Sequence, residues 1–299
     1  MIRNRSMSIE GRPLALPDWL KAGVWPFETF GLEVDGSLLA VTEAGHGPAI
    51  LFVHVGTWSI VWRDLVTQLA PQFRCIFFDA PGNGLSQRIS RAPLSLDRAA
   101  RAISGVIAAL DLRDLTVVAH DLAGPAAMAA MGEVPERIRG IVAMNAFGWR
   151  PLGAALRGML AIVGSRTMRE IDVLTGFLPR ITASSFGVGR HYDEQSRRAF
   201  LAGMGTSGRR AFHDYMRDAA RCERLYNKAQ GALAGPLARM PLLTIFGERN
   251  DPFGFQKEWK RRFPDARQVV VSRGNHFPMC DAPEFVGRAI RSWYEECVA

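Results

Sequence analysis

Three side chains that can carry out nucleophilic and acid–base chemistry follow apolar segments of the chain. Asp121 lies in AHDLAG, Asp251 in FGERNDPF and His276 in RGNHFP, each just beyond a segment that predicts a buried strand. Because the carboxyl ends of parallel strands meet at one edge of a sheet, we expect the three side chains to converge there. A nucleophile, an acid and a histidine in this chain order predict a catalytic triad, with Asp121 as the nucleophile.

The residues around Asp121 predict a tight turn between a strand and a helix. Ala119, Ala123 and Gly124 are small, as such a turn requires because it brings the strand and the helix close together. The simpler alternative is that Asp121 only caps the helix that follows it. Ser185, in ASSFG, fits a related small-x-Ser-x-Gly pattern, but no strand precedes it, and we assign it no catalytic role.

A carboxylate nucleophile selects the class of reaction. Attack on an ester carbonyl would produce a high-energy anhydride, whereas attack on an sp3 carbon with a good leaving group produces an ordinary alkyl ester on Asp121. His276, oriented by Asp251, would then activate water to hydrolyse that ester. The backbone N–H groups of Leu122 and Gly56 are the expected donors to the oxyanion that forms in this step.

The elements that must position these residues alternate along the chain. Apolar runs predict strands at 48–55, 73–80, 114–121, 137–147, 240–248 and 266–272. Amphipathic spacing predicts helices at 60–70, 96–111 and 282–296. This alternation is typical of an α/β fold with a mostly parallel central sheet flanked by helices. An antiparallel hairpin is expected before the first parallel strand, at the edge of the sheet.

The alternation stops between about residues 147 and 238, where helical segments occur without a convincing strand. We therefore expect a helical cap at 147–238, inserted into a core formed by 1–146 and 239–299. No internal repeat or low-complexity linker interrupts either part.

Composition indicates a cytoplasmic protein. The chain has 299 residues, 48% of them hydrophobic, and contains neither a run of signal-peptide type nor one long enough to cross a membrane. The net charge of +8 comes from scattered arginines, so we expect no nucleic-acid partner. The four cysteines show no metal-ligand spacing, and neither a metal nor a disulfide is expected.

These motifs resemble the haloalkane dehalogenase and epoxide hydrolase branch of the α/β-hydrolase fold, whose nucleophile is an aspartate. The resemblance is carried by WPFETF, GTWSIVWRDL, DAPGNGLS, HDLAGP and GNHFPMCDAPEFVGRAI. It implies a hydrolase with a helical cap that needs no cofactor and acts on a small apolar organic substrate with water. It does not fix the oligomeric state.

Two departures concern the leaving group. Dehalogenases of this branch usually carry His-Gly-Asn-Pro after the first parallel strand and a tryptophan after the nucleophile, and both motifs supply N–H donors to the halide. This chain has the shorter loop HVGTWS, with Gly56, and Leu122 after the nucleophile. A halide leaving without donors would face a large desolvation penalty. Trp58 and Trp149 are candidate replacement donors.

Epoxide hydrolases instead use cap tyrosines that donate to the epoxide oxygen, and Tyr215 and Tyr192 are the candidates here. The sequence therefore leaves open a dehalogenase-like hydrolase or an epoxide hydrolase. Alternatives of another class are a ligand-binding protein without turnover and a lyase or isomerase on the same fold.

Overall fold

One twisted sheet organises the chain in the computed structural model, which describes residues 12–88, 94–150 and 153–299. Within these ranges ten strands lie in the order β1-β2-β3-β5-β4-β7-β8-β9-β10, with β6 paired to β3. Their bounds are β1 Arg12–Pro13, β2 Thr29–Val34, β3 Ser37–Ala44, β4 Ala49–Val53, β5 Arg74–Phe78, β6 Gln87–Arg88, β7 Leu115–His120, β8 Ile138–Met144, β9 Leu242–Gly247 and β10 Arg267–Val271.

The strands from β5 to β10 in this order run parallel, and β2 and β3 form an antiparallel hairpin beside them. The predicted mostly parallel sheet with an edge hairpin is therefore confirmed. β4 lies between β5 and β7, so the order of the strands reverses there. The loops that follow β4 and β7 are consequently neighbours at the carboxyl edge, the position where open α/β sheets bind ligands.

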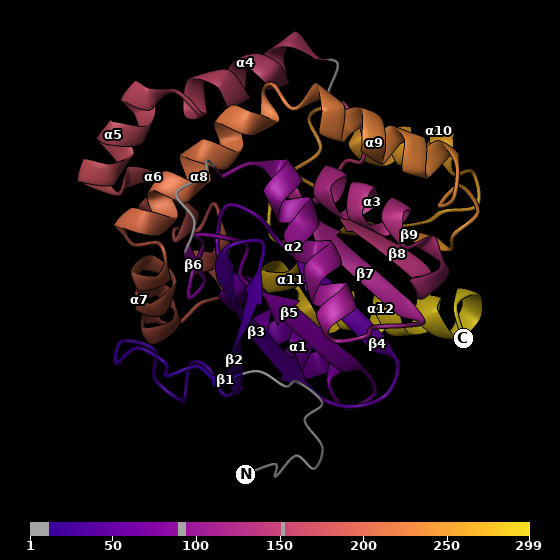
Figure 1. Cartoon of the computed structure of the whole chain (residues 1–299), viewed down its shortest axis with the longest axis horizontal. Helices are drawn as coiled ribbons and strands as arrows, with labels where there is room; N and C mark the ends of the chain where they lie inside the picture. The colour runs from indigo at the N-terminus through magenta and orange to yellow at the C-terminus, as the bar shows by residue number, and fades with distance from the viewer. Residues whose placement is uncertain (1–11, 89–93, 151–152) are drawn as a thin grey trace.

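Helices cover both faces of this sheet (Figure 1). The helical elements are η1 Ser59–Trp62, α1 Arg63–Leu69, α2 Leu96–Ala109, α3 Ala123–Glu133, η2 Pro135–Arg137, α4 Ala154–Val163, α5 Arg166–Thr175, α6 Phe177–Thr182, η3 Val188–Arg190, α7 Glu194–Gly203, α8 Thr206–Ala219, α9 Glu223–Ala234, α10 Phe255–Arg262, α11 Pro278–Asp281 and α12 Pro283–Cys297. Helices α2, α3 and α9 pack together, and α1 packs with α11 and α12. No helix among the described residues is long and apolar enough to span a bilayer.

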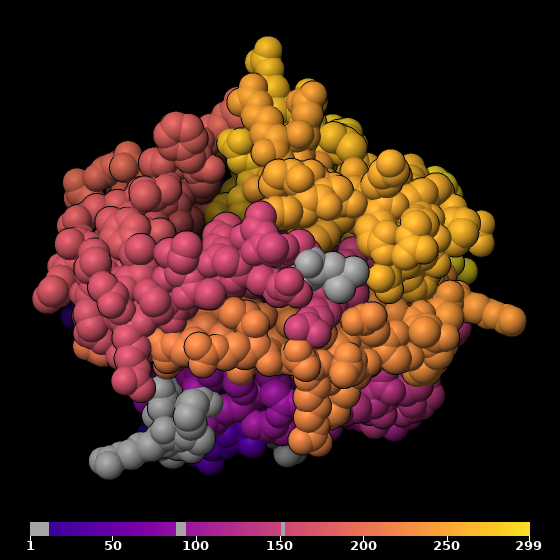
Figure 2. All heavy atoms as spheres, turned by 90° about the horizontal axis from the view of Figure 1, so that it is seen from above, coloured from indigo at the N-terminus to yellow at the C-terminus, as the bar shows by residue number. Residues whose placement is uncertain are grey.

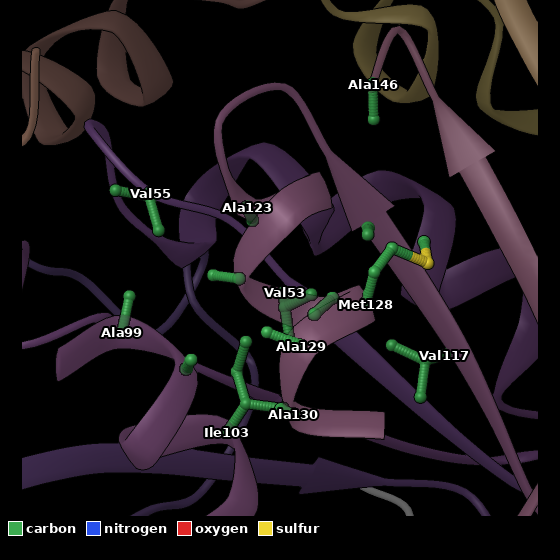
Figure 3. Packing of buried hydrophobic residues seen from close by; sticks show 14 of the residues in the cluster. Val53, Val55, Ala99, Ile103, Val117, Ala123, Met128, Ala129, Ala130 and Ala146 are labelled. Carbon is green, nitrogen blue, oxygen red and sulfur yellow. The ribbon is translucent and has the colours of Figure 1, made fainter. Parts of the chain in front are cut away.

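Alternating burial explains why the parallel strands read as continuous apolar runs. Along β4, Leu51 and Val53 belong to the core cluster that contains α2 and α3, whereas Ile50 and Phe52 belong to the cluster that contains α1 and α12. Both faces are therefore covered by helices, and each strand must be apolar on both sides. Figure 3 shows the first cluster, in which the alanines of α3 allow that helix to lie close to the sheet.

Helices α4 to α9 lie between β8 and β9, where the sequence predicted a helical cap. Figure 2, which views the molecule of Figure 1 from above, shows their side chains, coloured rose to orange, across much of the face turned to the viewer. A buried pair joins α5 to α8, with His213 Nε2 at 3.2 Å from Asp172 Oδ2. Helix α9 contacts the core helix α3, and the limits 147–238 for the cap stay a prediction. Residues 1–11 and 89–93 of the predicted core and 151–152 of the predicted cap lie outside the described residues.

Candidate active site

Asp121 occupies the turn between β7 and α3 in a left-handed conformation, with φ of +51°. Such a conformation is uncommon for a residue with a side chain and is often found at functional sites. Gly124 N–H donates to Asp121 O across the turn, at 3.0 Å. A Cβ atom at Gly124 would lie 2.1 Å from the backbone oxygen of Phe147. The prediction that this position must be small is therefore confirmed.

The turn brings Asp121 to His276, which lies between β10 and α11. Asp121 Oδ2 is 3.8 Å from His276 Nε2, and the two side chains are 24% and 34% exposed, so a substrate can reach both. Burial raises the pKa of Asp121, while His276 and the backbone N–H of Leu122 oppose the shift. The carboxylate therefore retains an N–H donor, that of Leu122, and sits next to an imidazole.

Asp251 is not the partner of this imidazole, contrary to the sequence prediction. Its two carboxylate oxygens accept the backbone N–H groups of Phe255 and Gln256, at 2.7 and 2.9 Å, at the start of α10. It also lines an open hollow of about 530 Å³ beside α10. The residue that meets His276 Nδ1 is Asn250, whose Nδ2 lies 3.3 Å away. The first N–H groups of a helix have no acceptor within the helix and carry a partial positive charge. At the start of α10 they therefore bind the carboxylate of Asp251, which the sequence had predicted to be the partner of His276.

The two predicted oxyanion donors differ in their availability. Leu122 N–H interacts with the Asp121 carboxylate, as an oxyanion formed on that group would require. Gly56 N–H instead donates to Asn83 Oδ1 at 3.2 Å, which corrects the expectation that it is free. Gly56 has φ of +102°, and a Cβ atom there would lie 3.2 Å from Phe212 of α8, so this loop also contacts the cap.

Two further histidines connect this loop to the site. Thr57 N–H donates to His54 Nε2 at 3.2 Å, which places the ring proton of His54 on Nδ1. His54 Nδ1 lies 2.9 Å from His120 Nδ1, so the His120 proton is on Nε2, which donates to His276 O at 2.7 Å. Burial lowers the pKa of His54 to about 3, with a further contribution from His276, and it also lowers that of His120. Both rings are therefore neutral and fix the backbone at His276.

The candidate tryptophans make structural contacts. Trp58 Nε1 donates to Phe200 O at 3.1 Å, and the side chain is buried. Trp149 is also buried, with its ring centroid 4.8 Å from that of Trp259 and the guanidinium of Arg262 over its face at 4.6 Å. Neither contact directs an indole N–H toward Asp121.

The candidate tyrosines also donate to the backbone. Tyr192 OH donates to Ile60 O at 2.9 Å, and Tyr215 OH donates to Pro81 O at 2.8 Å. Both side chains are buried, and both hydroxyls attach the segment inserted between β8 and β9 to the part of the chain before β8. The structure thus gives each of them a role in holding the cap on the core.

Comparison with known proteins agrees with the fold. A family model described as the alpha/beta hydrolase family matches residues 50–289, which is most of the chain. The chain belongs to the alpha/beta hydrolase family.

Individual relatives of this alpha/beta hydrolase include haloalkane dehalogenases. Haloalkane dehalogenase 2 of Mycobacterium tuberculosis is 27% identical over 278 residues, covering 89% of this chain and 95% of that protein. Cis-3-alkyl-4-alkyloxetan-2-one decarboxylase of Shewanella oneidensis is 25% identical over 292 residues, covering 91% and 89%. The structure of haloalkane dehalogenase DbeA from Bradyrhizobium elkani USDA94 superposes with a TM-score of 0.77 at 21% identity, covering 91% and 98%. The hydrolase is therefore haloalkane dehalogenase-like.

Sequence reasoning missed three residues of this hydrolase site. Asn250 was overlooked because the adjacent Asp251 has the expected chemistry, although Asn250 stands one residue nearer to the strand. Asn83 lies in a glycine-rich turn and is fully buried, and its Nδ2 has no hydrogen-bond partner in the part of the chain that the structure describes. His120 has no role in the prediction from the sequence, although its place next to Asp121 was a usable signal. Among the described residues no cluster of His, Cys, Asp and Glu is suited to a metal ion.

Proposed function

We propose that this alpha/beta hydrolase acts on small apolar alkyl electrophiles through a covalent ester on Asp121. The observation that carries the proposal is the pair formed by Asp121 and His276, at 3.8 Å, with the N–H of Leu122 on the same carboxylate. Asp121 Oδ attacks the sp3 carbon, the bond to the leaving group breaks, and an alkyl ester and a free anion result. No cofactor takes part in either step.

The second step regenerates the carboxylate. Water attacks the carbonyl carbon of the Asp121 ester, and its proton passes to His276 Nε2. The oxyanion develops on an oxygen of Asp121 itself, where the N–H of Leu122 supports it. Collapse of this intermediate expels the alkoxide, which takes the proton from His276 and leaves as the alcohol, and the second proton of the water passes to solvent as the carboxylate re-forms.

The leaving group is the part of the site that departs most from a dehalogenase-like scheme. Trp58, Tyr192 and Tyr215 already donate to backbone carbonyls. Two side-chain donors near Gly56 have no partner in the described residues, Asn83 Nδ2 and Thr57 Oγ1. We assign the leaving anion to Asn83, whose Oδ1 is fixed by Gly56 and whose amide is therefore held in one orientation.

A second candidate is favoured by the same shortage of donors. In a strained cyclic ester such as an oxetan-2-one, Asp121 would attack the sp3 ring carbon that is bonded to the ring oxygen. The bond between this carbon and the ring oxygen breaks, and the ring opens. The carboxylate released stays attached, then leaves as carbon dioxide, while its bonding electrons form an alkene and expel Asp121. This sequence consumes no water and needs no separate anion site. The relative from Shewanella oneidensis is named for such a decarboxylation.

The experiment that tests the proposal uses His276→Phe, which removes the base for the second step. The purified variant is incubated with 1-bromohexane, 1,2-epoxyhexane or a 3,4-dialkyl-oxetan-2-one, and the peptide containing Asp121 is weighed. A hexyl adduct supports the dehalogenase-like reaction, and a hydroxyhexyl adduct supports the epoxide reaction. Alkene formed from the lactone by the wild type supports the second candidate. Absence of any adduct or alkene with a folded protein contradicts both.

A further inference from the structure

The partner of His276 Nδ1 is an amide in place of a carboxylate. Asn250 Nδ2 lies 3.3 Å from Nδ1, and in residues 12–88, 94–150 and 153–299 no carboxylate oxygen is hydrogen-bonded to this nitrogen. In the orientation found here the amide presents Nδ2, a donor, to Nδ1. This arrangement favours the tautomer with the ring proton on Nε2, the nitrogen that faces Asp121, and in either orientation the amide brings no negative charge to the imidazole.

This tautomer opposes ester hydrolysis. To take a proton from water, Nε2 must present a lone pair, which requires the ring proton on Nδ1 and an acceptor that stabilises the resulting imidazolium. Asn250 offers neither a negative charge nor, in this orientation, an acceptor. In a Ser-His-Asp protease, replacement of the equivalent aspartate by asparagine lowers kcat by about 10⁴ for this reason. The first step of the proposed reaction, attack by Asp121, needs no base.

Two other carboxylates of this region bind backbone N–H groups. The backbone oxygen of His276 accepts Asn145 Nδ2 at 2.9 Å as well as His120 Nε2 at 2.7 Å, which fixes the loop. Asp251 is bound to the first turn of α10. Asp281 Oδ2 accepts the backbone N–H of Asn275 at 2.6 Å, and its buried Oδ1 has no hydrogen-bond partner among the described residues.

We propose that this hydrolase separates its two half-reactions and accumulates as an alkyl-enzyme ester on Asp121. The inference rests on the proposed covalent function. An alkyl halide and the Asp121 carboxylate give the ester and free halide in a step that needs no base. Hydrolysis of the ester to the alcohol, the carboxylate and a proton is slow, because Asn250 favours the tautomer of His276 whose Nε2 must lose its own proton before it can accept one from water. Asn250 is thus a positioning residue that sets the lifetime of the ester, and the chain is a long-lived acceptor of alkyl groups.

The test follows one turnover of the intact wild-type protein with excess 1-bromohexane. We expect a burst of about one bromide per chain, with a hexyl adduct on Asp121 visible in the intact mass. The adduct then decays slowly after the free halide is removed. Asn250→Asp should shorten the half-life of the adduct by at least about 100-fold, because a carboxylate at this position accepts from Nδ1 and stabilises the imidazolium. Asn250→Ala is the matched control: it removes the amide donor but supplies no acceptor, and it should shorten the half-life far less than Asn250→Asp does.

Each remaining outcome contradicts either the covalent function of Asp121 or the long-lived ester that Asn250 controls. If His276→Phe is labelled but the wild type turns over without a burst, the proposed function stands and the long-lived ester is excluded. If neither protein is labelled by 1-bromohexane, the covalent function itself fails for alkyl halides. If the wild type is labelled and a folded Asn250→Asp variant decays no faster, Asn250 does not control the second step. Because the wild-type burst requires no substitution, the long-lived ester remains testable even if a variant does not fold.

Discussion

His54 and His120 meet through their Nδ1 atoms, 2.9 Å apart, in the interior of the protein. One ring belongs to the loop after β4, and the other belongs to the strand that ends at Asp121. Because His120 also donates to His276 O at 2.7 Å, the pair connects three segments of the candidate site through neutral rings. The arrangement requires both histidines to be unprotonated.

The first prediction is that protonation of His54 opposes folding in mild acid. Burial lowers its pKa from 6.5 to about 3 in the folded protein, so below pH 6.5 the unfolded chain binds a proton that the folded chain does not. Stability from this group is therefore present above pH 6.5 and is lost as the pH falls toward 3. At pH 5 the loss amounts to about 2 kcal/mol. Urea unfolding of the wild type and of His54→Gln measures it.

The stability difference between these two proteins should shrink by about 2 kcal/mol from pH 7.5 to pH 5. The matched control is His46→Gln, at an exposed loop position. If the free energy of unfolding depended on pH equally in all three proteins, His54 would not be a buried neutral histidine.

The second prediction concerns Asp251, whose carboxylate binds Phe255 N–H and Gln256 N–H. Asp251→Ala should lower the free energy of unfolding by about 0.5–2 kcal/mol, the usual effect of losing a helix cap. The half-life of the hexyl ester on Asp121 should change by less than about 3-fold, because Asp251 does not hold His276. Lys257→Ala, on the exposed face of the same helix, is the control for stability. A loss of ester hydrolysis by orders of magnitude would restore Asp251 to the triad.

The third prediction concerns the close approach at Gly124. Gly124→Ala would place Cβ 2.1 Å from Phe147 O, a backbone atom that cannot move without shifting the turn. We expect a loss of about 1–3 kcal/mol of stability, together with slower labelling of Asp121. Gly158→Ala in α4 meets no atom within 4 Å and should stabilise the protein by about 0.5–1 kcal/mol. Equal stability of the two variants in urea would show that the turn is looser than described.

The fourth prediction separates the epoxide route from the others. Tyr215→Phe removes the hydroxyl that donates to Pro81 O, so stability should fall by about 1 kcal/mol. In the His276→Phe background, the rate of labelling by 1,2-epoxyhexane should change by less than about 3-fold, and Tyr192→Phe should behave alike. An epoxide hydrolase that used either tyrosine as an acid would lose about 10²–10⁴-fold in this rate.

The fold was accessible from the sequence because its signals are local. Strands such as β4 and β7 are buried on both faces, and their continuous apolar runs identify them as parallel strands. The small residues around Asp121 predicted the turn, because close packing of a helix on a strand leaves no room for a side chain at Gly124. These features depend on neighbours in the chain or on the period of burial.

The sequence by itself predicted the strand–helix turn that holds Asp121, the place of His276 after the last strand, and the family. Tertiary structure alone decided which groups those residues meet. Asp251 and Asn250 are adjacent in the chain, and the choice between them depends on where α10 begins and attracts the carboxylate. The engagement of Gly56 by Asn83 and of Tyr215 by Pro81 likewise joins segments that are separated in the chain. Hydrogen-bond partners are selected by distances of a few tenths of an ångström between distant segments, and only the folded chain sets these distances.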